Sequence, residues 1–167
     1  MNKTTDIVSI RFFVEIFSIT ALLFVGYMLI IYYSELPNTV PSHYNICGEA
    51  DAYSRKWVIF IVPILMIITY IALSILQRKP HIFNYPIQVT DENRDGLYKV
   101  GVEMVVVCKM LVMLMFAALC ASCVFDSINK KGYVNIWFIL IPSIGLLIVP
   151  IYYIVKMYTQ RDRKSVV

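Results

Sequence analysis

The stretch ELPNTVPSHYNICGEADAYSR, residues 35–55, lies between two long apolar runs and decides how the chain must be organised. Connections longer than about 12–15 residues are usually either functional or disordered. Disordered linkers are rich in Ser, Glu, Lys and Gln, whereas this stretch places Pro, His, Tyr, Asn and Gly at close spacing. We therefore expect residues 35–56 to form a small folded cap on a membrane protein.

Apolar residues dominate the rest of the chain and make up 59% of the whole. Each of four apolar runs is long enough to cross the roughly 30 Å of bilayer hydrocarbon as a helix. None shows the alternation that is typical of a barrel strand. We predict an all-α integral membrane protein with a single domain over residues 1–167 and helices at about 10–34, 57–77, 91–125 and 133–158.

Local signals refine these helices. Thr90, followed by two acidic residues, predicts an N-cap for the third helix, so that residues 78–90 form an inner connection. Pro142 and Pro150 predict bends in the fourth helix. The first helix is expected to be a retained signal anchor, because no small-x-small cleavage site follows it.

The Lys and Arg residues predict the orientation. With the N-terminus inside, ten of the 15 lie in cytoplasmic segments and four lie outside, while Lys109 falls within a helix. The positive-inside rule then favours a multi-pass membrane protein with both termini cytoplasmic and an extracellular cap. The net charge of +4 reflects this anchoring, and we expect no nucleic-acid partner.

The cap gathers polar side chains that can bind a ligand. His43, Asn45, Glu49 and Asp51 lie within nine residues, and such groups bind a divalent metal or donate and accept hydrogen bonds to a peptide or head group. Their spacing matches no closed zinc site, and no nucleophile accompanies them. We therefore expect no catalytic residue, no metal, no cofactor and no enzymatic activity. In the simpler interpretation Gly48 makes a turn with positive φ, and His43 and Asp51 stabilise the cap.

The cysteines and small residues leave alternatives open. A disulfide between Cys47 and Cys123 is allowed by the topology, and the C-x-x-C of Cys120 and Cys123 is weak redox evidence on a membrane helix. The small-x-x-x-small pairs predict close packing within the bundle or, alternatively, a homodimer: Ala117 with Ala121, and Ala118 with Ser122.

Three ionisable residues fall within the apolar helices: Glu15, Glu103 and Lys109. Local pairs four residues apart, Arg11 with Glu15 and Lys99 with Glu103, are the simplest explanation. Glu15 and Lys109 are also expected at a comparable depth, which predicts an ion pair between the first and third helices. In the alternative, Lys109 extends to the inner head groups.

The cap also resembles a known family. The motif Leu36-Pro37-x-x-Val40-Pro41-x-His43-Tyr44-Asn45-x-x-Gly48-x-x-Asp51-x-Tyr53-x-x-Lys56 is similar to the signature loop of a widespread bacterial membrane domain of unassigned function. That domain also forms the N-terminal part of immunity proteins against the sporulation-delaying toxin, which typically carry further helices. The resemblance covers roughly residues 12–110 and implies a protein of the bacterial cytoplasmic membrane. It implies a binding role for Pro41, His43, Asn45, Gly48, Asp51 and Lys56, to which we add the neighbouring Tyr53.

Three classes of function follow. The first is an immunity-like protein whose cap binds or blocks an extracellular peptide toxin or envelope component. The second is a transporter or a subunit of a transport complex that uses Glu15 and Lys109. The third is a membrane enzyme with His43 and Asp51. Besides the lipid bilayer, the expected partners are further membrane subunits and a cytoplasmic regulator at residues 91–99 or 161–164.

Overall fold

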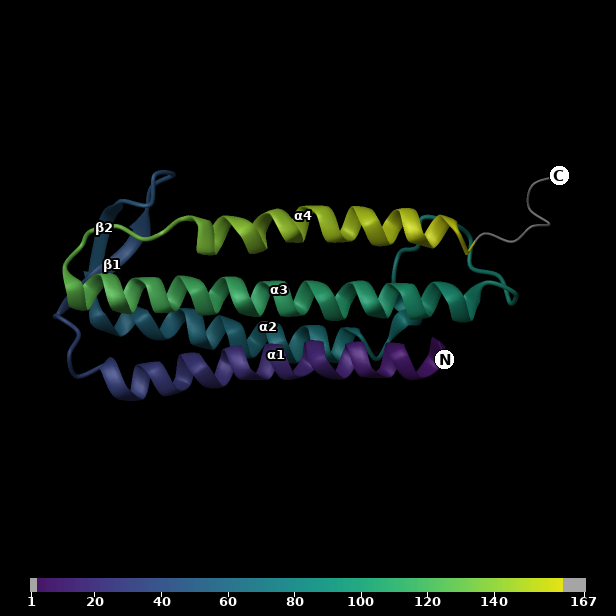
Figure 1. Ribbon diagram of the computed structural model, residues 1–167, viewed down its shortest axis with the longest axis horizontal. Helices are drawn as coiled ribbons and strands as arrows, with labels where there is room; N and C mark the ends of the chain where they lie inside the picture. Colours follow the sequence, from purple (N-terminus) through teal and green to yellow (C-terminus); the bar gives the residue numbers. More distant parts are fainter. Residues whose placement is uncertain (1–2, 161–167) are drawn as a thin grey trace.

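The computed structural model describes residues 3–160, with side chains described from residue 11 onward. Four helices lie side by side, and α1 begins at the end of the bundle where α4 ends (Figure 1). Each is long and apolar enough to cross a membrane, α2 together with the 3-10 turn η1 that precedes it. The prediction of four helices of membrane-spanning length is therefore confirmed. The helices and η1 are α1 (Lys3–Tyr32), η1 (Lys56–Phe60), α2 (Ile61–Leu76), α3 (Arg94–Asn129) and α4 (Trp137–Tyr158).

The longest helix, α3, is the centre of the bundle. Its 36 residues span roughly 54 Å, which exceeds the thickness of the hydrocarbon core. It packs against α1, α2 and α4, whereas α4 packs chiefly against α3 and makes no extensive contact with α1 or α2 in the described chain. Figure 1 shows α4 on the opposite side of α3 from α1. The fourth helix is thus attached to the bundle along one face only.

The cap is a β-hairpin, so the all-α prediction was wrong for this segment. Strand β1 (Thr39–Tyr44) pairs in antiparallel fashion with β2 (Ala50–Arg55). The turn is built by Asn45, whose Oδ1 accepts from the backbone N–H groups of Cys47 at 2.9 Å and Glu49 at 3.0 Å. Gly48 has a φ of +82°, as predicted. The side-chain amide of Asn45 thus accepts the backbone hydrogen bonds of the turn and stabilises the connection between the two strands.

The hairpin shares the apolar core of the bundle. Val40 on β1 is fully buried in the cluster that also contains Val25 of α1, Met66 of α2 and Val124 of α3. The thiol of Cys123 donates to the Pro41 carbonyl at 3.3 Å. Both Cys47 and Cys123 are free thiols, which excludes the disulfide considered from the sequence. The hairpin is therefore fixed to the helices by burial rather than by a covalent bond.

Several helix ends differ from the predicted positions. The N-cap of α3 is Asn93, whose backbone N–H donates to Thr90 Oγ1 at 3.3 Å, so the helix begins at Arg94. The start of α4 is delayed to Trp137, because residues 132–134 pair instead with the hairpin: Val134 N–H donates to the Gly48 carbonyl, and Ala50 N–H to the Gly132 carbonyl, both at 2.8 Å. The helix α4 continues without interruption through Pro142 and Pro150. The inner connection contains the short turn η2 (Pro80–Ile82).

Replacing Gly48 by Ala should destabilise the hairpin, because φ is positive there and the added Cβ would lie 2.5 Å from the Val134 carbonyl oxygen. We expect Gly48→Ala to lower the unfolding temperature in detergent, with a cost of about 1–2 kcal/mol from the left-handed backbone alone. Gly132→Ala has a similar φ of +71° without a clash, so it should cost less. Gly26→Ala, whose Cβ meets no atom within 4 Å, is the control. Equal unfolding temperatures for all three variants would contradict this account of the turn.

Candidate functional site

The most strongly constrained polar group is Lys109, which is 0% exposed in the middle of α3. Its Nζ lies 2.5 Å from Glu15 Oε1 and donates to Ser74 Oγ at 3.1 Å and to Gln77 Oε1 at 3.0 Å. An ammonium group has three N–H donors, so each has an acceptor. The same Nζ lies 4.8 Å from the centre of the Tyr70 ring. The structure thus joins α1, α2 and α3 at one buried charge.

The carboxylate of Glu15 also accepts several hydrogen bonds. It accepts from Gln77 Nε2 at 3.1 Å and from the Tyr70 hydroxyl at 3.3 Å, in addition to Lys109. Gln77 therefore bridges the pair, since its amide oxygen faces the ammonium and its amide nitrogen faces the carboxylate. We call Glu15, Tyr70, Ser74, Gln77 and Lys109 the buried polar cluster. Lys109 does not extend to the head groups, and Glu15 pairs with it across helices rather than with Arg11.

Glu103 also pairs across helices. Its carboxylate accepts from Lys156 Nζ of α4 at 2.8 Å, instead of from Lys99 one turn away on its own helix. The local pairs considered from the sequence are therefore replaced by two interhelical ones. The interhelical pairs place both carboxylates between helices, where Glu15 is 26% exposed and Glu103 is 14% exposed.

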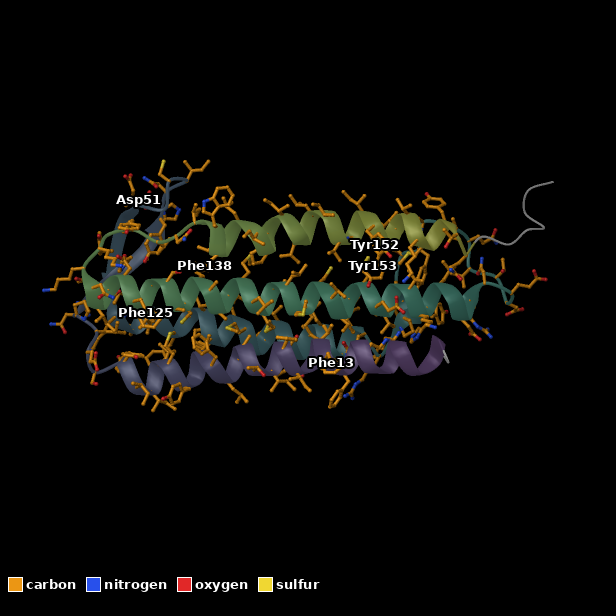
Figure 2. All side chains as sticks on the ribbon, viewed as in Figure 1. Phe13, Asp51, Phe125, Phe138, Tyr152 and Tyr153 are labelled. Atoms are coloured by element: carbon orange, nitrogen blue, oxygen red, sulfur yellow. The ribbon has the colours of Figure 1, made fainter. Side chains whose placement is uncertain are left out.

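The hairpin carries the other predicted site residues. His43 Nδ1 and Asp51 Oδ1 lie 2.5 Å apart on the exposed surface, and Asn45 Nδ2 donates to Glu49 at 2.9 Å. Lys56 lies over the Tyr33 ring, 4.8 Å from its centre. Ile46, at the turn, is 91% exposed, and Tyr53 on β2 is 58% exposed. Figure 2 shows Asp51 at the hairpin end of the bundle, far from Tyr152 and Tyr153.

A buried carboxylate anchors the hairpin to α3, and sequence reasoning missed it. Asp126 is 4% exposed and accepts from the Tyr44 hydroxyl and from the Tyr133 backbone N–H, both at 3.2 Å. Burial raises the pKa of Tyr44 well above its usual value, and nearby Cys123 and Asp126 add to that rise. Tyr44 therefore remains a neutral hydrogen-bond donor at any physiological pH.

Two surface hollows flank this anchor. A groove of about 270 Å³ lies between the hairpin and the end of α3 and is lined by Thr39, Tyr53, Asp126 and Lys130, among others. A larger one, of about 720 Å³, is lined by Ala118, Ala121 and Ser122 on α3 and by residues that lead into α4. Ala117, in contrast, is buried in the core. The small residues of α3 thus serve both interior packing and an open hollow.

The polar side chains at these sites can donate and accept hydrogen bonds. Within residues 3–160, no three His, Cys, Asp or Glu side chains are placed to hold a metal ion together. The His43–Asp51 pair fixes two side chains on the hairpin surface and leaves the other ring nitrogen of His43 to donate or accept.

A pattern in the sequence does identify the members of the buried polar cluster that were missed. Tyr70, Ser74 and Gln77 recur at intervals of four and three residues within an otherwise apolar helix. That spacing places them on one helix face, and polar residues in a membrane helix face the bundle interior. Asp126, by contrast, follows a long apolar run and is indistinguishable from an ordinary turn residue.

Removing one partner of the buried ion pair should cost more than removing both. Glu15→Gln leaves the fully buried Lys109 without a counter-charge, and we expect a cost of about 3–5 kcal/mol. Lys109→Met should cost less, because Glu15 is 26% exposed and keeps Gln77 and Tyr70 as donors. The double variant should recover most of the loss. Unfolding temperatures in detergent measure all three, with Glu35→Gln as the exposed control; no change in any variant would exclude the pair as a stabilising contact.

Comparison with known proteins adds a family match to this geometry. Residues 19–67, from the second half of α1 through the hairpin into the first half of α2, match a family described as a domain of unknown function, DUF1648. An uncharacterized protein of Archaeoglobus fulgidus is 34% identical over 62 residues, which cover 32% of this chain and 34% of that protein. The match thus spans about a third of the relative's length. No solved structure matches. The chain is therefore similar to this family in the segment that contains the hairpin.

Proposed function

We propose that this protein is a multi-pass protein of the bacterial cytoplasmic membrane that binds an extracellular peptide through its hairpin and gives immunity-like protection. Both termini are cytoplasmic in this proposal. The basic residues support the orientation: Arg11, Arg78 and Lys99 lie at the end of the bundle opposite the hairpin, within the group of ten on that side. The hairpin then faces the outside.

The observation that carries the binding role is the outer edge of β2. Lys56 N–H donates to the Asn38 carbonyl, and hydrogen-bonded pairs alternate along an antiparallel ladder. Tyr53 therefore occupies a non-hydrogen-bonded position opposite Pro41. Pro41 itself has no backbone N–H donor. The N–H and C=O of Tyr53 point away from β1. An exposed strand edge of this kind binds an extended peptide by adding it as a further strand.

The surroundings of this edge suit a peptide. Residues 132–134 already pair with the start of β2, so a ligand strand would continue the same edge toward Arg55. The groove beside Tyr53 offers a place for a ligand side chain, with Asp126 and Lys130 on its wall. Because the hairpin is anchored by Val40, Tyr44 and Pro41, the edge is presented in one fixed position, which lowers the ordering cost of binding.

The buried polar cluster favours transport as a second function, because intramembrane charges mark substrate or proton paths. It is weaker support, since Lys109 is fully enclosed and all three of its donors are used within the bundle. The uninterrupted α4 also differs from the broken helices of transporters. An enzymatic role would rest on His43 and Asp51 alone, and we assign none.

Tyr53→Pro tests strand addition, because it removes the outward N–H at a position where an edge strand tolerates proline. A toxin-sensitive bacterial host expressing the chain is challenged with membrane-active peptide toxins of the sporulation-delaying type. We expect wild-type protein to protect and Tyr53→Pro to weaken peptide affinity about tenfold, from the loss of one backbone hydrogen bond. Tyr53→Ala, which keeps the N–H, is the matched control.

All variants are compared at equal abundance in the membrane, and the two Tyr53 variants also at equal unfolding temperatures. Amide exchange at residue 53 should slow when a protective peptide is added. Equal protection by Tyr53→Pro and Tyr53→Ala would exclude the strand edge. Protection lost in Lys109→Met alone would move the site into the bundle and favour transport.

A further inference from the structure

A further pocket, of about 290 Å³, lies among α1, α3 and α4 at the end of the bundle away from the hairpin. We propose that it binds the phosphate head group of an anionic phospholipid, with the upper part of an acyl chain seated between α1 and α4. Its polar wall consists of Arg11, Glu103 and Lys156, and its apolar wall of Val14, Val106 and Val107. Tyr152 and Tyr153 complete it, and Figure 2 shows both along α4 near this end.

The charges of this pocket favour an anion. Lys156 and Glu103 neutralise each other at 2.8 Å, which leaves the guanidinium of Arg11 as the surplus charge. The carboxylate one turn along α1, Glu15, is occupied by Lys109 and does not pair with Arg11. The pocket therefore carries one net positive charge in a segment of the bundle that lies next to lipid.

Arg11 also has an unused donor. Its Nη2 donates to the Lys99 carbonyl at 3.3 Å, but its Nε is inaccessible to solvent and has no hydrogen-bond partner among the described residues. A buried donor without a partner is costly, so native proteins rarely leave one. Binding of a phosphate oxygen to Nε therefore requires the Arg11 side chain to turn toward the pocket, and the guanidinium is the side chain best shaped to bind phosphate.

The apolar wall argues for a lipid rather than for a free anion. The helices α1 and α4 both pack on α3 but make no extensive contact with each other in the described chain, so the pocket opens between two membrane-spanning helices. A ligand there meets charge at one end and valine side chains at the other. Basic pockets between membrane helices bind lipid head groups for this reason. The bound lipid would also fill the gap beside α4, which otherwise packs chiefly against α3.

Native mass spectrometry of the full chain in detergent tests the site, with phosphatidylglycerol and phosphatidylcholine of identical chains as the probes. We expect wild-type protein to retain phosphatidylglycerol at least about fivefold better, and Arg11→Gln to lose about fivefold of that retention, from one basic contact. Arg78→Gln is the matched control, since Arg78 lines a neighbouring pocket that shares Arg11 but contains no residue of α4, and a lipid bound there would lose retention in both variants. Equal retention of the two lipids, or equal effects of the two substitutions, would overturn the proposal.

A second variant covers the case in which Arg11→Gln does not fold. Val107→Trp fills the apolar wall and keeps every charge, so it should reduce phosphatidylglycerol retention while the protein stays monodisperse. Unchanged retention would overturn the proposal. Inorganic phosphate tests whether the pocket binds free phosphate or a lipid head group. If inorganic phosphate raises the unfolding temperature as much as phosphatidylglycerol does, the pocket binds free phosphate and the lipid assignment is wrong.

Discussion

The buried ammonium group of Lys109 is the constraint on which the bundle depends. A charge in the hydrocarbon region is costly unless it is paired, and every N–H of this group must find an acceptor. The acceptors come from α1 and α2, while the lysine itself is on α3. Sliding or rotating any of these helices past its neighbours would separate the buried charges. Apolar packing alone would tolerate several alternative arrangements in lipid, so this cluster specifies the register of three helices.

The fourth helix is held by a different set of interactions. It contacts α3, pairs with it through Lys156 and Glu103, and leaves its other faces to lipid or to a partner. At the hairpin end, residues 132–134, which lead into α4, form backbone hydrogen bonds with the hairpin. The start of α4 is therefore held close to the hairpin. The molecule therefore combines three helices joined by a buried polar cluster with a peripheral helix whose position depends on contacts at both of its ends.

Part of this arrangement follows from the sequence. The four spans can be predicted because a bilayer imposes a fixed length of apolar residues, and the turn at Gly48 because few residues tolerate a positive φ. The contact of Glu15 with Lys109 was one of two interpretations, since depth along two helices suggests proximity but not facing sides. The partner of Glu103 was missed because spacing on one helix reveals only local pairs. Which faces of α3 and α4 meet is a tertiary property.

The hairpin was missed for a related reason. Its strands are short, partly polar and lack clear alternation, so no period identifies them. Their stability comes from Val40 in the helix core and from the Tyr44–Asp126 hydrogen bond, both of which need the assembled bundle. This dependence also separates the two candidate functions. Transport requires the charged cluster to rearrange, yet the register of α1, α2 and α3 rests on that cluster, and the hairpin rests on the same core. A binding surface needs the reverse: a core that does not move and an edge that stays in place. This constraint is the physical argument for preferring the proposed binding function over transport.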